Sequence, residues 1–175
     1  MPEDLTRYVL EVNPWTPLED LREFTLMRGV IVGAWASVET VLKEIALKAS
    51  RLEPYIDVDV RIPKKNSEII EYLKVLTTIK GPIYSIADDL KSLMLNFESH
   101  SNDRNMLAHA HMQVLPNWGA TFSSYVAKRD KIGGDYFAYE ERRLTLLQMD
   151  ELARAATVLS HKAQAIRQKF LEHLE

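Results

Sequence analysis

Apolar residues recur at alternating spacings of three and four over the first third of the chain, which is the pattern of one face of an α-helix. Arg28 is the charged residue that interrupts this stripe. Thr16, Pro17 and Glu19 suit an N-cap, a first helical position and a capping-box partner. The pattern therefore predicts a long amphipathic helix over residues 17–50. Its apolar stripe consists of Leu21, Phe24, Ile31, Trp35, Val38, Leu42, Ile45 and Ala49.

A second stripe of the same period begins near Ser67 and predicts a second helix. The stripe keeps its phase across Gly81-Pro82. A proline inside a helix removes one hydrogen bond and pushes on the preceding turn, so we expect a kink there, with two separate helices as the alternative. The apolar stripe consists of Ile69, Tyr72, Leu76, Ile79, Ile83, Ile86, Leu90, Leu93 and Phe97.

Two more helices are predicted nearer the C-terminus. A polar helix follows the capping residues Ser99–Asp103 and continues to Pro116 or to just before it. The last helix begins at Thr145-Leu146-Leu147-Gln148, which has the capping-box pattern. Its apolar face consists of Leu152, Ala156, Leu159, Ala163, Ile166 and Phe170.

The stretch Asn117–Leu144, between these two helices, has no helical period. Its β-prone segments Phe122–Lys128 and Tyr136–Arg142 flank a polar turn that contains Gly133-Gly134. Two β-prone runs joined by a glycine-containing turn predict a β-hairpin.

Three long helices and one shorter polar helix can bury their apolar faces against each other. The sequence therefore predicts an all-α fold, an antiparallel (up-and-down) four-helix bundle with a kinked second helix and a small β-hairpin before the last helix. Residues 1–175 form a single helical domain in this prediction. Short extended pieces are expected at Tyr8–Val12 and Ile56–Ile62, outside the bundle.

Composition limits the classes of protein. With 46% hydrophobic and 27% charged residues, the chain resembles an average globular domain. It has no cysteine, which excludes disulfides and thiolate metal sites. Its net charge of −3 gives no general attraction to nucleic acid, so such a contact needs a local patch. The chain has no run of about eighteen apolar residues and no signal-like start, so we expect a cytoplasmic protein without a membrane segment.

The segment Asn102–His111 concentrates the candidate chemistry. On a helix, Asn105 and His109 share a face because they are four residues apart, while Arg104 and His111 share an adjacent face. Histidine exchanges protons near neutral pH, and a guanidinium can hold a phosphate by two hydrogen bonds. From spacing alone, however, the commoner explanation of such residues is a solvated helix surface.

The stretch Arg104-Asn105-Met106-Leu107-Ala108-His109 resembles the R-x4-6-H signature of HEPN domains, a family of small helical bundles. In that family a polar residue such as asparagine often follows the arginine, and the signature lies near the start of a late helix. Trp35-Ala36-Ser37-Val38-Glu39 in the first helix also resembles the family, which often has an acidic or polar residue there. His111 satisfies the looser spacing R-x6-H. We prefer His109, since RN-x3-H is the commoner form, and leave His111 as the alternative.

This resemblance implies a metal-independent endoribonuclease that needs no cofactor. Two signatures would meet across a homodimer and cleave RNA to a 2′,3′-cyclic phosphate end. Arg104 and His109 would be catalytic, and Asn105 would orient His109 or hold a phosphate oxygen. Glu39 would either orient Arg104 or His109 or be a surface carboxylate. A toxin or defence component of this kind would have an antitoxin or another protein as partner. Members regulated by tyrosine modification carry H-x-Y, and His111 in place of that tyrosine argues against such regulation.

Several alternatives remain beside this hypothesis. A non-catalytic helical dimer that binds RNA or a protein partner is the alternative function. His109 and His111 suggest zinc, but residues two apart on a helix diverge by about 200° and chelate badly. His100 and Asp103 would complete such a site only if the segment is not helical. The basic and aromatic residues of the predicted hairpin suit single-stranded RNA, although nearby carboxylates nearly cancel its charge and favour an ordinary solvated hairpin.

Overall fold

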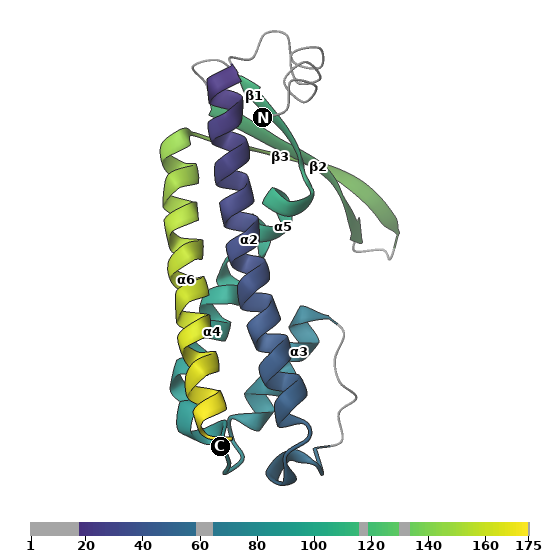
Figure 1. Cartoon of the computed structure of the whole chain (residues 1–175). Helices are drawn as coiled ribbons and strands as arrows, with labels where there is room; N and C mark the ends of the chain where they lie inside the picture. The colour runs from purple at the N-terminus through teal and green to yellow at the C-terminus, as the bar shows by residue number, and fades with distance from the viewer. Residues whose placement is uncertain (1–17, 59–64, 116–118, 130–133, 175) are drawn as a thin grey trace. The chain divides into compact units, whose positions relative to one another are not determined.

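The computed structural model describes residues 18–58, 65–115, 119–129 and 134–174 (Figure 1). In these ranges the chain forms five α-helices, two 3-10 turns and three β-strands. Their order is α2 (Leu18–Ala49), η1 (Glu53–Tyr55), α3 (Asn66–Leu76), η2 (Tyr84–Ile86), α4 (Ala87–Ser99), α5 (Ser101–His109), β1 (His111–Leu115), β2 (Gly119–Arg129), β3 (Asp135–Leu144) and α6 (Leu146–Glu172).

The prediction of an all-α four-helix bundle is wrong, because the three strands form an antiparallel sheet before the last helix. The segments predicted as a hairpin, Phe122–Lys128 and Tyr136–Arg142, do lie in β2 and β3 and pair with each other. The additional strand, β1, lies where a helix was expected. Pairing with β2 satisfies the backbone groups that β1 directs toward that strand, and Val114 is buried. The fold is therefore mixed and mostly helical.

The chain divides into two compact units. The first consists of the part up to Val32 together with Asn102–Arg154; it contains the sheet, and we call it the sheet unit. The second consists of Gly33–Ser101 and the part from Ala155 onward, and we call it the helical unit. Helices α2 and α6 each contribute residues to both units.

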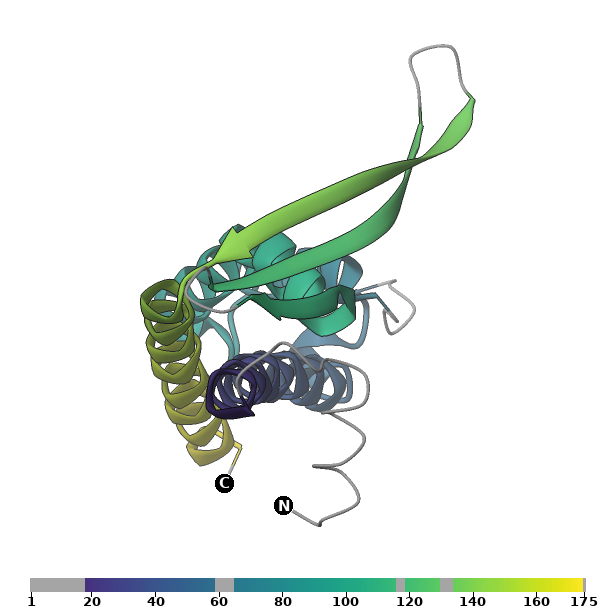
Figure 2. The same cartoon turned by 90° about the horizontal axis from the view of Figure 1, so that it is seen from above.

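The sheet unit has the strand order β1-β2-β3. Strand β1 pairs with Gly119–Ser123 only, whereas β3 pairs with β2 from Ala120 to Arg129. As a result β2 and β3 continue past the end of β1 as a two-stranded ribbon, which is the long arm in Figure 2. Strand alternation places Ala120, Phe122 and Leu144 on one face, where all three are buried.

The first residue of β2 has to be glycine. Gly119 has a φ of 95°, a backbone conformation that residues with a β-carbon rarely adopt. A β-carbon at this position would also lie 2.4 Å from the carbonyl oxygen of Leu144 on the neighbouring strand. Glycine therefore permits both the backbone conformation and the close approach of the chain to the end of β3.

The helical unit contains the aromatic core residues Trp35, Tyr55 and Phe170, which are almost completely buried. An ion pair joins α2 to α6: the guanidinium of Arg167 donates to both carboxylate oxygens of Glu44, at 2.6 and 3.0 Å. Helices α2 and α6, far apart in the sequence, therefore pack against each other here.

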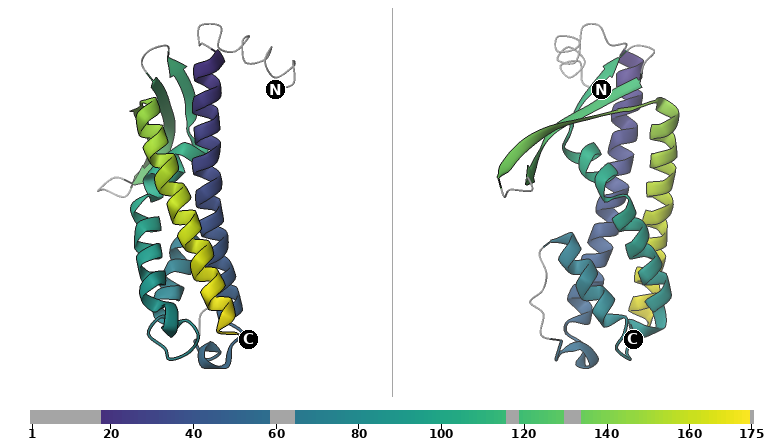
Figure 3. Two further views of the ribbon diagram at one scale, coloured as in Figure 1. Left: turned by 60° about the vertical axis from the view of Figure 1, so that its left-hand side comes forward. Right: turned by 180° about the vertical axis from the view of Figure 1, so that it is seen from behind.

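The predicted kink at Gly81-Pro82 is wrong, and the alternative of two separate helices holds. Helix α3 ends at Leu76, and α4 begins only at Ala87 after the 3-10 turn η2. Figure 3 shows α3 and α4 running in opposite directions. The reversal packs against Tyr55, whose hydroxyl accepts the N–H of Ile83 at 2.8 Å. A β-carbon at Gly81 would lie 2.5 Å from that hydroxyl, so glycine is needed for this contact.

Helices α2 and α6 confirm the two helices predicted from the apolar periodicity. Helix α2 matches the predicted helix 17–50, although the Thr16-Pro17 cap lies outside the described residues. At the start of α6 the capping box is present, with the Thr145 N–H donating to Gln148 Oε1 at 2.9 Å and the Gln148 N–H donating to Thr145 Oγ1 at 3.2 Å.

The remaining extended and turn predictions fall largely on residues outside the described ranges. Tyr8–Val12 and Gly133 lie there entirely. Of the piece predicted at Ile56–Ile62, the described part begins in the turn that follows η1 and is not a strand.

Candidate functional site

Helix α5 carries the three preferred site residues. Arg104 is half-buried, while Asn105 and His109 are exposed. The Nη2 of Arg104 donates to Oδ1 of Asn105 at 2.9 Å. His109 lies one helical turn after Asn105, as the i, i+4 spacing predicts. The structure therefore joins Arg104 to Asn105 directly and places His109 next along the same helix.

His111 does not lie on this helix, so the prediction that it shares a face with Arg104 is wrong. Helix α5 ends at His109, and His111 is the first residue of β1, where it pairs with Ser123. The predicted helix up to Pro116 stops early because the segment from His111 to Leu115 pairs its backbone with β2. The side chain of His111 is exposed.

Arg28 caps the C-terminal end of α5. Its Nε donates to the Leu107 carbonyl at 2.6 Å, and its Nη2 donates to the carbonyls of Ala110 at 2.9 Å and Ala108 at 3.4 Å. The last carbonyls of a helix have no partner within the helix and form its negative end. A guanidinium with several donors suits this position, and it fixes the helix end that carries His109.

The surroundings of Arg28 are partly apolar. Its guanidinium lies 6.0 Å from the centre of the Phe122 ring on β2, a cation–π contact. Partial burial removes water from the guanidinium and lowers the pKa of Arg28. The sequence alone assigns Arg28 no role. Its one signal there is that it is a charged residue within the apolar stripe of α2.

The start of α5 is fixed by a different contact. Asp103, which precedes Arg104, forms an ion pair with Nη1 of Arg142 on β3. Arg142 pairs in register with Phe122, so it projects from the same face of the sheet as that buried ring. Helix α5 is therefore held against this face at both of its ends, by Arg142 at one and by Arg28 at the other.

Glu39 lies in the helical unit, on α2. Its carboxylate forms an ion pair with Lys43, one turn farther along the same helix. That contact is the ordinary i, i+4 arrangement of a helix surface. A role of Glu39 toward Arg104 or His109 stays a prediction.

Among the described residues, no group of three or more histidines, aspartates and glutamates is arranged to hold a metal ion. His100, which the zinc hypothesis considered, follows the end of α4 and lies against Trp35, with 6.1 Å between the ring centres.

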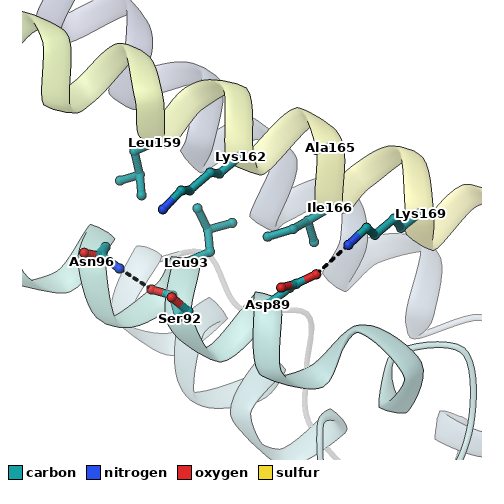
Figure 4. A pocket seen from close by; sticks show the side chains of 9 residues that line it. All are labelled: Asp89, Ser92, Leu93, Asn96, Leu159, Lys162, Ala165, Ile166 and Lys169. Carbon is teal, nitrogen blue, oxygen red and sulfur yellow. Dashed lines mark hydrogen bonds and ion pairs between the residues drawn. The ribbon is translucent and has the colours of Figure 1, made fainter.

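A groove of about 230 Å³ lies between α4 and α6 in the helical unit (Figure 4). Leu93 and Ile166 form its apolar floor, and Lys162 lies at its side. Lys169 is paired with Asp89 across the groove at 2.7 Å. None of the site residues predicted from the sequence lines it.

No helix within the described ranges is both long enough and apolar enough to cross a membrane. Comparisons with known proteins found no matching family model, no matching curated protein and no matching solved structure.

Proposed function

We propose that this chain is a HEPN-like, metal-independent endoribonuclease that acts as a homodimer, with Arg104 and His109 as its catalytic residues and Asn105 as their support. One observation carries the proposal. The Arg104 guanidinium is bonded to the Asn105 side chain on α5, and the exposed imidazole of His109 follows one turn later. The cation and the proton-transfer group are thus presented together on one short helix.

The chemistry needs little more than these groups. The 2′-oxygen of a ribose attacks the adjacent phosphorus while the bond to the 5′-oxygen of the next nucleotide breaks, which leaves a 2′,3′-cyclic phosphate. An imidazole can take the proton of the 2′-hydroxyl, and a second imidazole from the other protomer can protonate the leaving oxygen. Arg104 would stabilise the negative charge that builds on the phosphate. Asn105 would keep the guanidinium oriented.

Exposure of the motif also supports catalysis over a purely structural role. Asn105 and His109 are exposed, so substrate can reach them. Arg28 and Asp103 supply contacts that position the helix. Neither contact uses the exposed side chain of Asn105 or His109. In this proposal the protein is a toxin or defence component, and an antitoxin or similar protein would control it.

The test is RNA cleavage by the purified protein in excess EDTA. We expect the wild type to produce 2′,3′-cyclic phosphate ends, and Arg104→Ala and His109→Ala to lower the rate by about 100-fold or more. His111→Ala is the matched control, because it removes an exposed histidine two residues away that lies on β1. It should retain activity.

Two outcomes would reject the proposal. If a verified wild-type dimer cleaves none of a varied set of RNAs, the alternative of a non-catalytic dimer that binds RNA or protein is favoured. If EDTA abolishes cleavage, the reaction is not metal-independent. Equal loss in His111→Ala and His109→Ala would reject the preference for His109.

A further inference from the structure

The outward face of α5 carries a third polar side chain beside the two exposed residues of the motif. Each residue turns a helix by about 100°, so positions seven apart differ by only about 20°. Asn102 therefore lies almost in line with His109, and Asn105 lies between them along the axis. All three side chains are exposed. Asn102 thus belongs to the same surface as the exposed part of the motif.

The inner side of α5 fixes the direction of this face. Leu107 is fully buried, and Asp103 forms the ion pair with Arg142 on β3. These two inner residues lie about 100–160° around the helix from Asn102 and His109. The contacts of the inner side therefore turn Asn102 and His109 away from the sheet.

The side chain of Asn102 is left over by the fold. It makes no hydrogen bond to another residue of the described ranges, whereas the amide oxygen of Asn105 accepts one from Arg104 at 2.9 Å. Asparagine is also a weak helix former, so it does little to stabilise α5 by itself. The amide of Asn102 keeps one acceptor and two donors for a ligand.

This amide suits the base of a nucleotide better than a phosphate. A carboxamide presents a donor and an acceptor side by side, whereas a phosphate offers acceptors only. Of the four bases, adenine matches an asparagine side chain by two hydrogen bonds, through N6 and N7. In an RNA duplex these atoms lie in the deep major groove, which side chains cannot read. Such a contact therefore requires an unpaired nucleotide.

We propose that Asn102 is a specificity-determining residue, which binds the adenine of an unpaired nucleotide near the bond that is cleaved. The inference rests on the proposed function, because it assigns RNA to the same helix face. Seven residues of helix place Asn102 and His109 about 10 Å apart along the axis. At about 3.4 Å per stacked nucleotide, the adenine lies within about three nucleotides of the cleaved phosphodiester. The substrate class is single-stranded RNA with an adenosine at a fixed distance from the cut.

Mapping of cleavage sites in excess EDTA tests this contact with the full chain. The probes are oligouridylates that carry one adenosine, moved one position at a time, and the same strand without adenosine. We expect the wild type to cut at a constant distance from the adenosine, at least about fivefold faster than in the all-uridine strand. Annealing a complementary strand should abolish this preference.

Asn102→Asp removes the amide donors and keeps the shape of the side chain. An acidic residue in the first turn interacts favourably with the positive end of a helix, so this variant should be at least as stable as the wild type. We expect it to lose the preference for adenosine. Asn102→Ser, which has one hydroxyl in place of the amide, should lose it too. Asn66→Asp adds the same charge in the first turn of α3 and is the matched control, which should keep the preference.

Three results would overturn the inference. The first is a wild type that cuts without regard to adenosine. The second is an adenosine preference that persists in Asn102→Asp and Asn102→Ser, or that Asn66→Asp loses equally. The third is a lower urea midpoint in both Asn102 variants with an equal loss of cleavage at every position, because Asn102 then only stabilises α5.

Failure of the proposed function would look different. Fluorescence anisotropy with the same oligonucleotides measures binding without cleavage. Binding that prefers the adenosine strand and loses this preference in Asn102→Asp, in a protein that cleaves no RNA, rejects the ribonuclease and retains the base contact. Cleavage that depends on Arg104 and His109 but not on adenosine rejects the contact alone. A protein that neither cleaves RNA nor prefers the adenosine strand rejects both.

Discussion

At the scale of single residues, Arg28 shows why a charge stands in an otherwise apolar helix stripe. Its guanidinium reaches the carbonyls of Leu107, Ala108 and Ala110 at the end of α5. A partly buried charge is costly unless it is paired or well hydrogen-bonded. Here the helix end provides acceptors with negative partial charge, and Phe122 provides a ring face.

Arg28→Met should destabilise the protein by about 1–3 kcal/mol, because carbonyls at the end of α5 lose a charged donor while the apolar stem is largely kept. It should also lower RNA cleavage, since His109 is the last residue of that helix. Urea unfolding and the cleavage assay measure the two effects. Arg22→Met, on the exposed side of α2, is the control. Equal stability of the two variants would contradict the capping role.

Tyr55 is a second residue with a structural role, because its hydroxyl holds the chain reversal before α4. Tyr55→Phe should cost about 1–3 kcal/mol, because the Ile83 N–H is left without its buried acceptor. Tyr84→Phe removes a hydroxyl from a 56% exposed ring and should be nearly neutral. The urea midpoints of the two variants give their stabilities relative to the wild type. If the two variants are equally stable, the chain reversal before α4 does not depend on this hydrogen bond.

At the scale of elements, α5 is too short to be stable by itself. Isolated helices under about 12–15 residues are marginal in water, and α5 runs only from Ser101 to His109. Its polar sequence buries Leu107 and little else. Arg28 at its end and the Asp103–Arg142 ion pair near its start help to hold it in position.

A double-mutant cycle on Asp103→Ala and Arg142→Ala tests the second contact. Because the Arg142 side chain is 48% exposed, we expect a coupling energy of only about 0.5 kcal/mol in unfolding experiments. Both single variants should nevertheless lower RNA cleavage, since Arg104 follows Asp103 directly. The ion pair does not position the motif if the stability losses of the two single variants simply add in the double variant and RNA cleavage is unchanged.

At the scale of the whole molecule, contacts between distant parts of the chain close the helical unit. Arg167 on α6 binds Glu44 on α2, and Gln164 donates to the Ser37 hydroxyl at 3.1 Å. These residues are 123 and 127 positions apart in sequence. Folding of the helical unit thus requires that α6, the last helix, returns to α2.

The Glu44–Arg167 pair predicts an acid-sensitive contribution to stability. The hydrogen bond from Arg167 lowers the pKa of Glu44 below its ordinary value of 4.5, although partial burial opposes this. A lowered pKa in the folded state stabilises the protein above the ordinary carboxyl pKa, and this contribution is lost as the pH falls through the lowered value.

Glu44→Gln should therefore be less stable than the wild type at pH 7, and the difference should shrink as the pH falls below about 4. Urea midpoints across this range measure it. Glu23→Gln, an exposed change on the same helix, is the reference variant. A difference that stays constant with pH would mean that the ionised form of Glu44 is not preferentially stabilised.

The amino-acid sequence by itself determined the elements that depend on local pattern. The stripes of α2 and α6, the capping box at Thr145 and the β-prone segments of β2 and β3 all reflect side-chain periodicity or adjacent residues. The placement of Asn105 and His109 on one helix has the same origin, since i, i+4 spacing is local. These features were predictable because neighbours along the chain produce them.

Only the tertiary structure decided the rest. The segment from His111 to Leu115 became a strand because β2 offered its backbone a partner. The chain reversed near Gly81 because it packs on Tyr55, and Arg28 found acceptors on a helix 79 residues away in sequence. Each of these outcomes depends on long-range backbone pairing or packing that overrides the local helical period, which is why the sequence predicted a helical bundle with a β-hairpin and missed the third strand of the sheet.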